Sequence, residues 1–285
     1  MKSHMLEEKC SMFNYDPSAP LDFEVLSEQK QRNTTLQDIT YTSPKGGKVP
    51  AYLIIPPEAG PFAGVIFVHW GEGNRDEFVD EALELAPLGT VSLLIDAPLA
   101  RPEPWTAPGN TPEEFRESDI QLVIDIQHGI DLLLTRPDID RQRLGYVGHS
   151  LGATKGGIVA GIEKRVRAYV FMAGLPSVAD SFRTSAHPDM VEMRATTSTE
   201  ELEHLISLME PLDAIHYVGK AAPAALFFQF ARHDEFVTER DALWYEQVAS
   251  SPKLTKWYET DHQFNPEARH DRVAWLCTQL SLKSR

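Results

Sequence analysis

The residues Gly148-His149-Ser150-Leu151-Gly152 match the pattern G-x-S-x-G. An apolar run at 143–147 precedes them, and a helix-compatible run at 153–162 follows. A serine on a tight turn between a strand and a helix is lifted out of the sheet and presented to a substrate. Glycine is favoured at both ends of the motif because side chains would collide at so strained a turn. The context therefore predicts that Ser150 is a nucleophile in an α/β fold.

Apolar runs typical of strands buried on both faces recur along the chain. They lie at 64–69, 90–96, 144–148, 168–172, 225–230 and 254–258. Apolar residues three and four apart, which is the spacing typical of helices, are found at 78–86, 119–135, 153–162, 241–248 and 268–281. This alternation predicts a mainly parallel sheet with helices on both faces. Two extended segments, 39–42 and 49–55, flank a turn-rich stretch and predict an antiparallel hairpin that opens the sheet.

The length of 285 residues is compatible with one α/β domain. Residues 1–35 are polar and are interpreted as an N-terminal extension, with a possible tag remnant at 1–4. The α/β domain is expected to occupy 36–285, with an insertion at about 175–222. A helix is expected at 199–209, and the favoured interpretation of the insertion is a small cap over the site; a packing elaboration is the alternative.

The composition is that of a globular protein, with 42% hydrophobic and 24% charged residues. A formal net charge of −15 would repel phosphate backbones and anionic lipids, so neither nucleic acid nor a membrane is expected as a partner. Residues 1–9 lack an apolar signal segment, which favours a cytoplasmic location. Cys10 and Cys277 suggest neither a disulfide framework nor a zinc cluster, and no metal or cofactor is expected.

A serine nucleophile needs a base to accept its proton and a carboxylate to orient that base. Asp234 follows the expected strand at 225–230, and His262 follows the expected strand at 253–258. Both positions fall at the carboxyl ends of strands, where open α/β sheets bind their ligands. We therefore predict a catalytic triad of Ser150, Asp234 and His262.

The chain order Ser, Asp, His is the order of α/β-hydrolases. With these motifs the chain resembles the dienelactone hydrolase-like group of that superfamily, which includes acetylxylan esterase-like enzymes, from about Thr35 to the C-terminus. The resemblance implies the α/β-hydrolase fold and acyl transfer. The best-known dienelactone hydrolases use cysteine, whereas this chain has Ser150, which favours esters more generally.

Two backbone N–H groups are expected to form an oxyanion hole. One is that of Leu151, directly after the nucleophile. The loop His69-Trp70-Gly71-Glu72-Gly73 resembles the H-G-G-x-G loop of the superfamily, and the N–H of Trp70 is predicted to be the second donor.

Five side chains are candidates for substrate contact, and each also has an ordinary structural interpretation. They are His69, Glu72, Trp105, His149 and Phe236. Three arginines are candidates for binding a substrate carboxylate: Arg101, Arg116 and Arg232.

These features predict a serine hydrolase that cleaves a small or medium acyl ester or a lactone through an acyl-enzyme. One alternative is a non-catalytic small-molecule-binding protein on the same fold. The other is a hydrolase that acts on C–C or peptide bonds. The sequence does not fix the oligomeric state, and a homodimer is one option.

Overall fold

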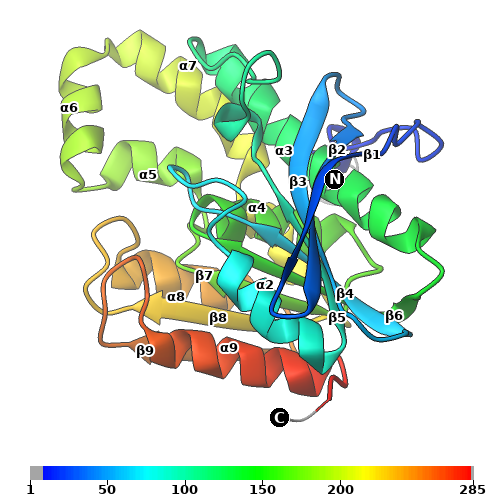
Figure 1. Cartoon of the computed structure of the whole chain (residues 1–285). Coiled ribbons are helices and arrows are strands. Elements are labelled where there is room, and N and C mark those ends of the chain that lie inside the picture. The colour runs from blue at the N-terminus through cyan, green and yellow to red at the C-terminus, as the bar shows by residue number, and fades with distance from the viewer. Residues whose placement is uncertain (1–8, 284–285) are drawn as a thin grey trace.

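The computed structural model describes residues 9–283, which form one nine-stranded sheet in the order β1-β2-β3-β5-β4-β6-β7-β8-β9 (Figure 1). The strands are β1 (Glu24–Gln31), β2 (Thr34–Thr42), β3 (Lys48–Ile55), β4 (Phe62–Val68), β5 (Thr90–Ile95), β6 (Ile139–His149), β7 (Ala168–Met172), β8 (Ala225–Ala231) and β9 (Lys253–Tyr258). Strands β5, β4 and β6 to β9 run parallel to one another. The predicted mainly parallel sheet is therefore confirmed.

The predicted hairpin is also confirmed, because β2 and β3 pair antiparallel near one end of the sheet. Beyond it, β1 adds a further antiparallel strand whose residues are all exposed. This strand lies inside residues 1–35, where the sequence showed only a polar segment. Its mixed polar composition lacks the apolar alternation that marks a half-buried strand.

The helices are α2 (Val79–Leu85), α3 (Pro112–Thr135), α4 (Leu151–Ile162), α5 (Val178–Thr184), α6 (Pro188–Thr196), α7 (Thr199–Met209), α8 (Glu239–Val248) and α9 (Pro266–Gln279). Six helices fall close to their predicted ranges, whereas α5 and α6, both within the insertion, were not predicted. Short 3-10 turns are η1 (Ala86–Leu88), η2 (Pro98–Ala100), η3 (Glu210–Leu212), η4 (Ala214–His216) and η5 (Val218–Lys220). Helix α3 begins seven residues earlier than its apolar pattern, because Thr111 and Glu114 form a capping box.

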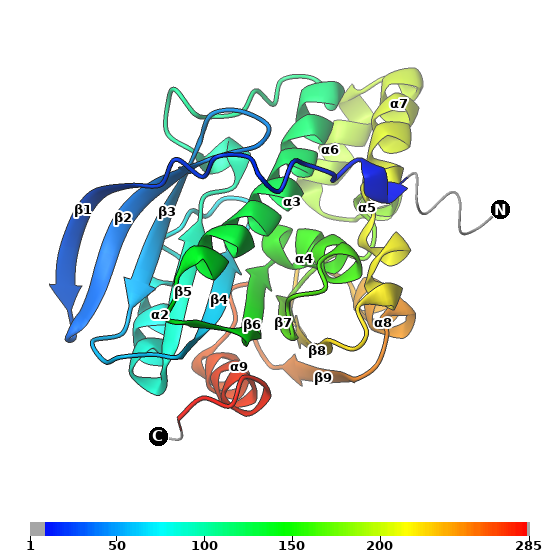
Figure 2. The ribbon, with the colours of Figure 1, turned by 90° about the vertical axis from the view of Figure 1, so that its right-hand side faces the viewer.

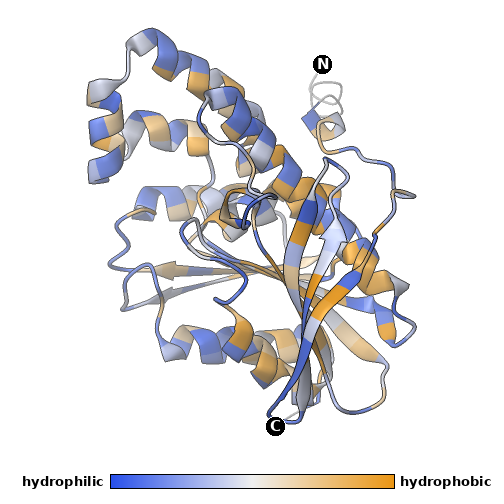
Figure 3. Cartoon of the chain, turned by 45° about the horizontal axis from the view of Figure 1, so that its top comes forward, coloured by the Kyte–Doolittle hydropathy of each residue, from blue (hydrophilic) through white to orange (hydrophobic). Residues whose placement is uncertain are grey.

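Two apolar cores lie on opposite faces of the sheet, because successive residues of a strand point to opposite sides. In β4, Ile66 and Val68 join the core beneath α3, α4 and α8. Val65 and Phe67 join the core beneath α2 and α9. Figure 2 shows these two layers of helices on either side of the sheet. Figure 3 shows that the helices carry both hydrophilic and hydrophobic residues. Because helices cover both faces of the sheet, the side chains on both sides of the central strands are buried. Continuous apolar runs without alternation therefore predict these strands.

The segment between β7 and β8 carries α5, α6 and α7, which stand beside the sheet, with α6 farthest from it (Figure 1). Helix α7 packs against α3 and α5. Its residues Ile206 and Met209 are fully buried, and Leu202 and Leu205 are packed partly buried against the same core. The apolar stripe predicted at 199–209 is therefore part of the main core. The insertion is anchored to the domain along this helix.

A buried ion pair fixes the chain after β5. The guanidinium of Arg101 donates to the carboxylate of Asp125 on α3, and their side chains are 1% and 0% exposed. Burial raises the pKa of the Asp125 carboxyl, and the neighbouring Arg101 lowers it. Arg101 also donates to the carbonyl of Asp96 at 3.3 Å. These contacts occupy Arg101 within the fold.

Replacing Arg101 by methionine should destabilise the protein by about 3–5 kcal/mol, because Asp125 would be left buried without its cation. The control is Arg32→Met, which removes an exposed arginine paired with Asp80 at 3.4 Å and should have little effect. Urea denaturation followed by circular dichroism measures both. Equal stability of the two variants would contradict this role of the pair.

Candidate active site

Ser150 lies alone between the end of β6 at His149 and the start of α4 at Leu151. Its backbone has a φ of 51°, which is a strained conformation for a residue with a side chain. A Cβ atom on Gly152 would lie 2.1 Å from the carbonyl oxygen of Val68, so glycine is required there. The predicted strand, turn and helix around the serine are therefore present.

The Asp234 and His262 side chains meet although they are 28 residues apart in the sequence. The Nδ1 atom of His262 lies 3.0 and 2.9 Å from the two carboxylate oxygens of Asp234. The N–H groups of Phe236 and Val237 donate to the same carboxylate at 2.8 and 3.0 Å. A carboxylate only accepts hydrogen bonds, so Nδ1 of His262 carries the ring proton. Nε2 of the same ring remains available to accept a proton from a nucleophile.

The third member of the predicted triad lies in the same region of the fold. His262 is linked to the residue before Ser150, because its carbonyl oxygen lies 2.8 Å from Nε2 of His149. Within residues 9–283, no hydrogen bond joins the Ser150 hydroxyl to the His262 ring. Catalytic hydrogen bonds often tighten only when a substrate is bound, so the lack of this bond is consistent with the proposed roles of the two residues.

The loop after β4 is tied to the nucleophile turn through His69. Nδ1 of His69 donates to the carbonyl of Trp70 at 2.6 Å, and Nε2 accepts from the N–H of Ala97 at 2.9 Å. Burial lowers the pKa of His69, which agrees with a neutral ring. Its carbonyl accepts the N–H of Gly152 at 3.2 Å. Both ring nitrogens of His69 are therefore used within the protein.

The two predicted oxyanion donors differ in their surroundings. In the described part of the chain, the N–H of Leu151 has no acceptor. The N–H of Trp70, by contrast, donates to the carboxylate of Glu77 at 2.9 Å. The neighbouring N–H of Gly71 has no acceptor among these residues either, and a Cβ atom on Gly71 would meet nothing within 4 Å. Trp70 can act as a donor only if its bond to Glu77 is exchanged.

His149 is buried beside the serine, and both its ring nitrogens are engaged. Nδ1 lies 2.6 Å from Oε1 of Glu77, and Nε2 lies 2.8 Å from the carbonyl of His262. Sequence analysis missed Glu77, because a carboxylate in a polar loop before α2 carries no motif. The ring of Trp70 stacks near that of His149, with centroids 6.3 Å apart.

The insertion reaches the same region through an aromatic stack. The ring of Phe236 lies 4.8 Å from that of His262, and the ring of His187, which caps α6, is stacked on Phe236 at 4.4 Å. Sequence analysis did not single out His187. Within residues 9–283, no hydrogen bond or ring contact joins the side chains of Glu72 or Trp105 to the three triad residues. The structure thus brings Phe236 to the site and leaves those two without such a link.

The other candidate arginines have protein partners. Arg116 bonds Glu117 at 2.7 Å, and Arg232 lies over the ring of Trp257 at 4.5 Å. Neither contacts a triad residue in the described chain.

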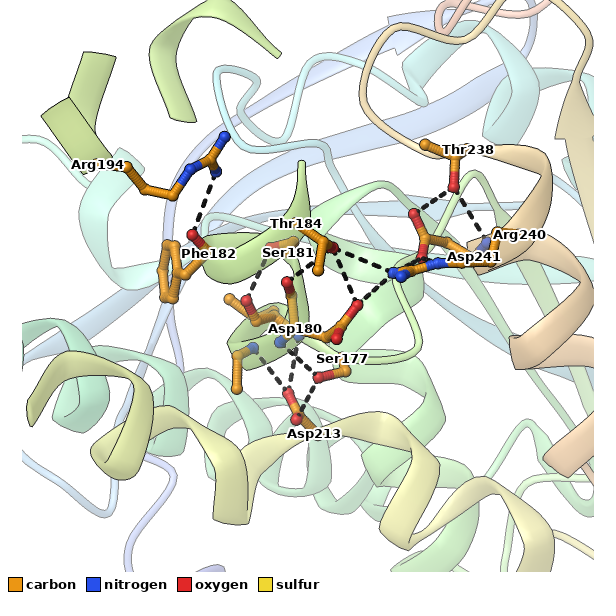
Figure 4. A network of polar contacts seen from close by, with 12 residues as sticks. Ser177, Asp180, Ser181, Phe182, Thr184, Arg194, Asp213, Thr238, Arg240 and Asp241 are labelled. Carbon is orange, nitrogen blue, oxygen red and sulfur yellow. Dashed lines mark hydrogen bonds and ion pairs between the residues drawn. The ribbon is translucent and has the colours of Figure 1, made fainter. Parts of the chain in front are cut away.

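The two ends of the insertion are joined by Asp213 (Figure 4). Its carboxylate accepts the N–H groups of Val178 and Ala179 at 2.8 and 3.2 Å, and the hydroxyl of Ser177 donates to it as well. Burial raises the pKa of Asp213 to about 6, although these hydrogen bonds lower it. The adjoining Asp180 forms an ion pair with Arg240 of α8. The network holds α5 against the body of the domain.

Comparison with solved structures identifies the fold. An acetyl xylan esterase from Paenibacillus sp. R4 has a TM-score of 0.81 at 16% identity, covering 97% of this chain and 94% of that one. Acetyl xylan esterase 1 from Thermoanaerobacterium sp. JW/SL YS485 also has a TM-score of 0.81, at 15% identity, covering 96% and 93%. A Klebsiella pneumoniae protein assigned as a dienelactone hydrolase has a TM-score of 0.60 at 18% identity, covering 85% and 97%.

The chain therefore has the α/β-hydrolase fold, as its motifs predict, and its structural neighbours include members of the predicted group. No family model and no curated protein matches its sequence. Across residues 9–283, every helix is too short or too polar to cross a membrane. The same residues contain no group of three histidine, cysteine or acidic side chains that could hold a metal ion.

Replacing Asp213 by asparagine should change how stability depends on pH. The folded-state pKa of about 6 lies above the ordinary value of 3.8, so the folded protein binds this proton more tightly than the unfolded chain. The wild type should therefore lose up to about 3 kcal/mol relative to the variant as pH rises from about 4 to 6. Urea denaturation at a series of pH values measures this difference, and parallel curves for the two proteins would contradict it.

Proposed function

We propose that this protein is a serine hydrolase that cleaves carboxylic esters or lactones with a small or medium acyl group. The observation that carries the proposal is the pairing of the Asp234 carboxylate with Nδ1 of His262, whose carbonyl bonds the ring of His149, the residue before Ser150 on its strained turn. Such a pair orients a neutral imidazole as a base toward a nucleophile. A fold used only for binding has no physical need for this arrangement.

In the proposed mechanism, Nε2 of His262 removes the proton from Ser150 as the serine oxygen attacks the ester carbonyl. The N–H of Leu151 and an N–H of the loop after β4 stabilise the oxyanion. His262 then donates its proton to the leaving alcohol. A water molecule, activated by His262, then attacks the acyl-enzyme in the same way and releases the acid. The carboxylate of Asp234 stabilises the imidazolium in both steps.

Two observations support a short acyl group. The ring of Phe236 lies 4.8 Å from that of His262, and the ring of His187 is stacked on the ring of Phe236, so two rings occupy the volume on that side of the histidine. Two structural neighbours are named acetyl xylan esterases, which act on acetyl esters by name. A substrate carboxylate is less favoured, because the guanidinium of Arg101 is buried and paired with Asp125.

Replacing Ser150 by alanine should abolish ester hydrolysis and labelling by a fluorophosphonate. His262→Gln should lower kcat by about three orders of magnitude or more, and Asp234→Asn by a smaller factor. The assay is hydrolysis of p-nitrophenyl acetate, with mass spectrometry to locate the phosphonate. Full activity of Ser150→Ala would exclude the proposed mechanism. Absence of both labelling and turnover in the wild type would favour a binding protein.

Replacing Phe236 by alanine should shift the preferred p-nitrophenyl ester toward longer acyl chains, because it removes a ring next to His262. We expect the wild type to prefer acetate or butyrate. The matched control is Phe23→Ala, which removes a ring that is 43% exposed and belongs to no part of the site. The same shift in both variants would argue against Phe236 as a wall of the acyl pocket.

A further inference from the structure

The histidine directly before the nucleophile is placed between two hydrogen-bond acceptors. Nε2 of His149 faces the carbonyl oxygen of His262 at 2.8 Å, and a carbonyl has no proton to give. Nε2 therefore carries a proton. Nδ1 faces a carboxylate oxygen of Glu77 at 2.6 Å, so one further proton lies between the ring and the carboxylate.

The second proton belongs on the ring rather than on Glu77. The other oxygen of Glu77 accepts the N–H of Trp70 at 2.9 Å, and a carboxylate with two donors is favoured in its ionised form. The side chain of Glu77 is also 20% exposed to water, whereas that of His149 is 1% exposed. His149 is accordingly an imidazolium, with Glu77 as its counter-ion.

The other titratable groups around His149 do not supply that proton. His69 has one ring nitrogen donating and one accepting, so it is neutral; burial lowers its pKa, although the nearby carboxylates of Asp96 and Glu77 raise it. The His262 ring lies 5.0 Å from the His149 ring and is paired with Asp234. The remaining rings that pack on His149, those of Trp70 and Phe264, do not titrate as acids in this range.

We propose that the ion pair of His149 and Glu77 positions the active site. We call this pair, together with its hydrogen bonds to Trp70 and His262, the charged clamp. The clamp joins the loop after β4 to the loop that carries the catalytic histidine. It also cancels the negative charge of Glu77, which would otherwise oppose an oxyanion forming near Trp70. This inference rests on the proposed function for its effect on turnover. The protonation of His149 can be tested independently of it.

The direct test is NMR of the protein labelled with ¹⁵N-histidine, with His149 assigned by the signal missing in His149→Gln. At neutral pH, the wild type should show both His149 ring nitrogens protonated. In Glu77→Gln, the amide can donate to Nδ1 and its oxygen can accept from Trp70, so the ring should carry one proton. A singly protonated ring in the wild type would overturn the inference, whether or not the protein hydrolyses esters.

Kinetics test the positioning role. Glu77→Ala removes the partner of both His149 and Trp70, so kcat should fall about tenfold or more, as expected for losing a hydrogen bond to a charged group. The wild type should lose activity at alkaline pH as the clamp loses its proton, and Glu77→Gln should lack that alkaline loss. The rate at which a fluorophosphonate labels Ser150 provides a second readout that needs no ester turnover.

The control is Asp80→Asn, which removes an exposed carboxylate from α2, a short way along the chain from Glu77. It should leave kcat, labelling and the pH profile as in the wild type, and melting curves confirm that each variant is folded. Wild-type kcat in folded Glu77→Ala, or an alkaline loss retained in Glu77→Gln, would overturn the clamp. Absence of any labelling at Ser150 in the wild type would instead count against the proposed function.

Discussion

The contact between the first turn of α4 and the backbone of β4 is the constraint on which the candidate site depends. Gly152 touches the carbonyl of Val68 so closely that no side chain fits between them. The helix can therefore begin immediately after the strand, which leaves Ser150 in a strained conformation between the two. The bond from the N–H of Ser150 to the carbonyl of Met172 helps to hold this conformation. The surrounding loops are then arranged about a fixed serine.

The three histidines of the site show how hydrogen-bond partners decide the chemistry of one residue type. His69 has an acceptor on one nitrogen and a donor on the other, which fixes a neutral ring. His262 has a carboxylate on one nitrogen and leaves the other available. His149 has acceptors on both. These differences arise from the position of each ring among the loops.

The predictions from the sequence were accurate where the deciding signal was local. Strand and helix periodicity placed the elements of the sheet, and the loops after β8 and β9 placed Asp234 beside His262. The apolar stripe of α7 was recognised in the same way. Strand β1 was missed, because an edge strand exposed on all its residues carries no apolar alternation. Its pairing with β2 depends on backbone hydrogen bonds, which any residue can make.

The sequence by itself determined the fold class and the residues proposed as the triad. Apolar periodicity and the motif of a strained turn depend only on residues that are close together in the sequence. Only the tertiary structure decided the contacts of Glu77 and His187, whose partners lie 72 and 49 residues away in His149 and Phe236. It also decided that the Trp70 N–H is already bonded. Hydrogen bonding and burial at these positions depend on loops that meet only when the sheet has formed, and no local pattern records which loops will meet.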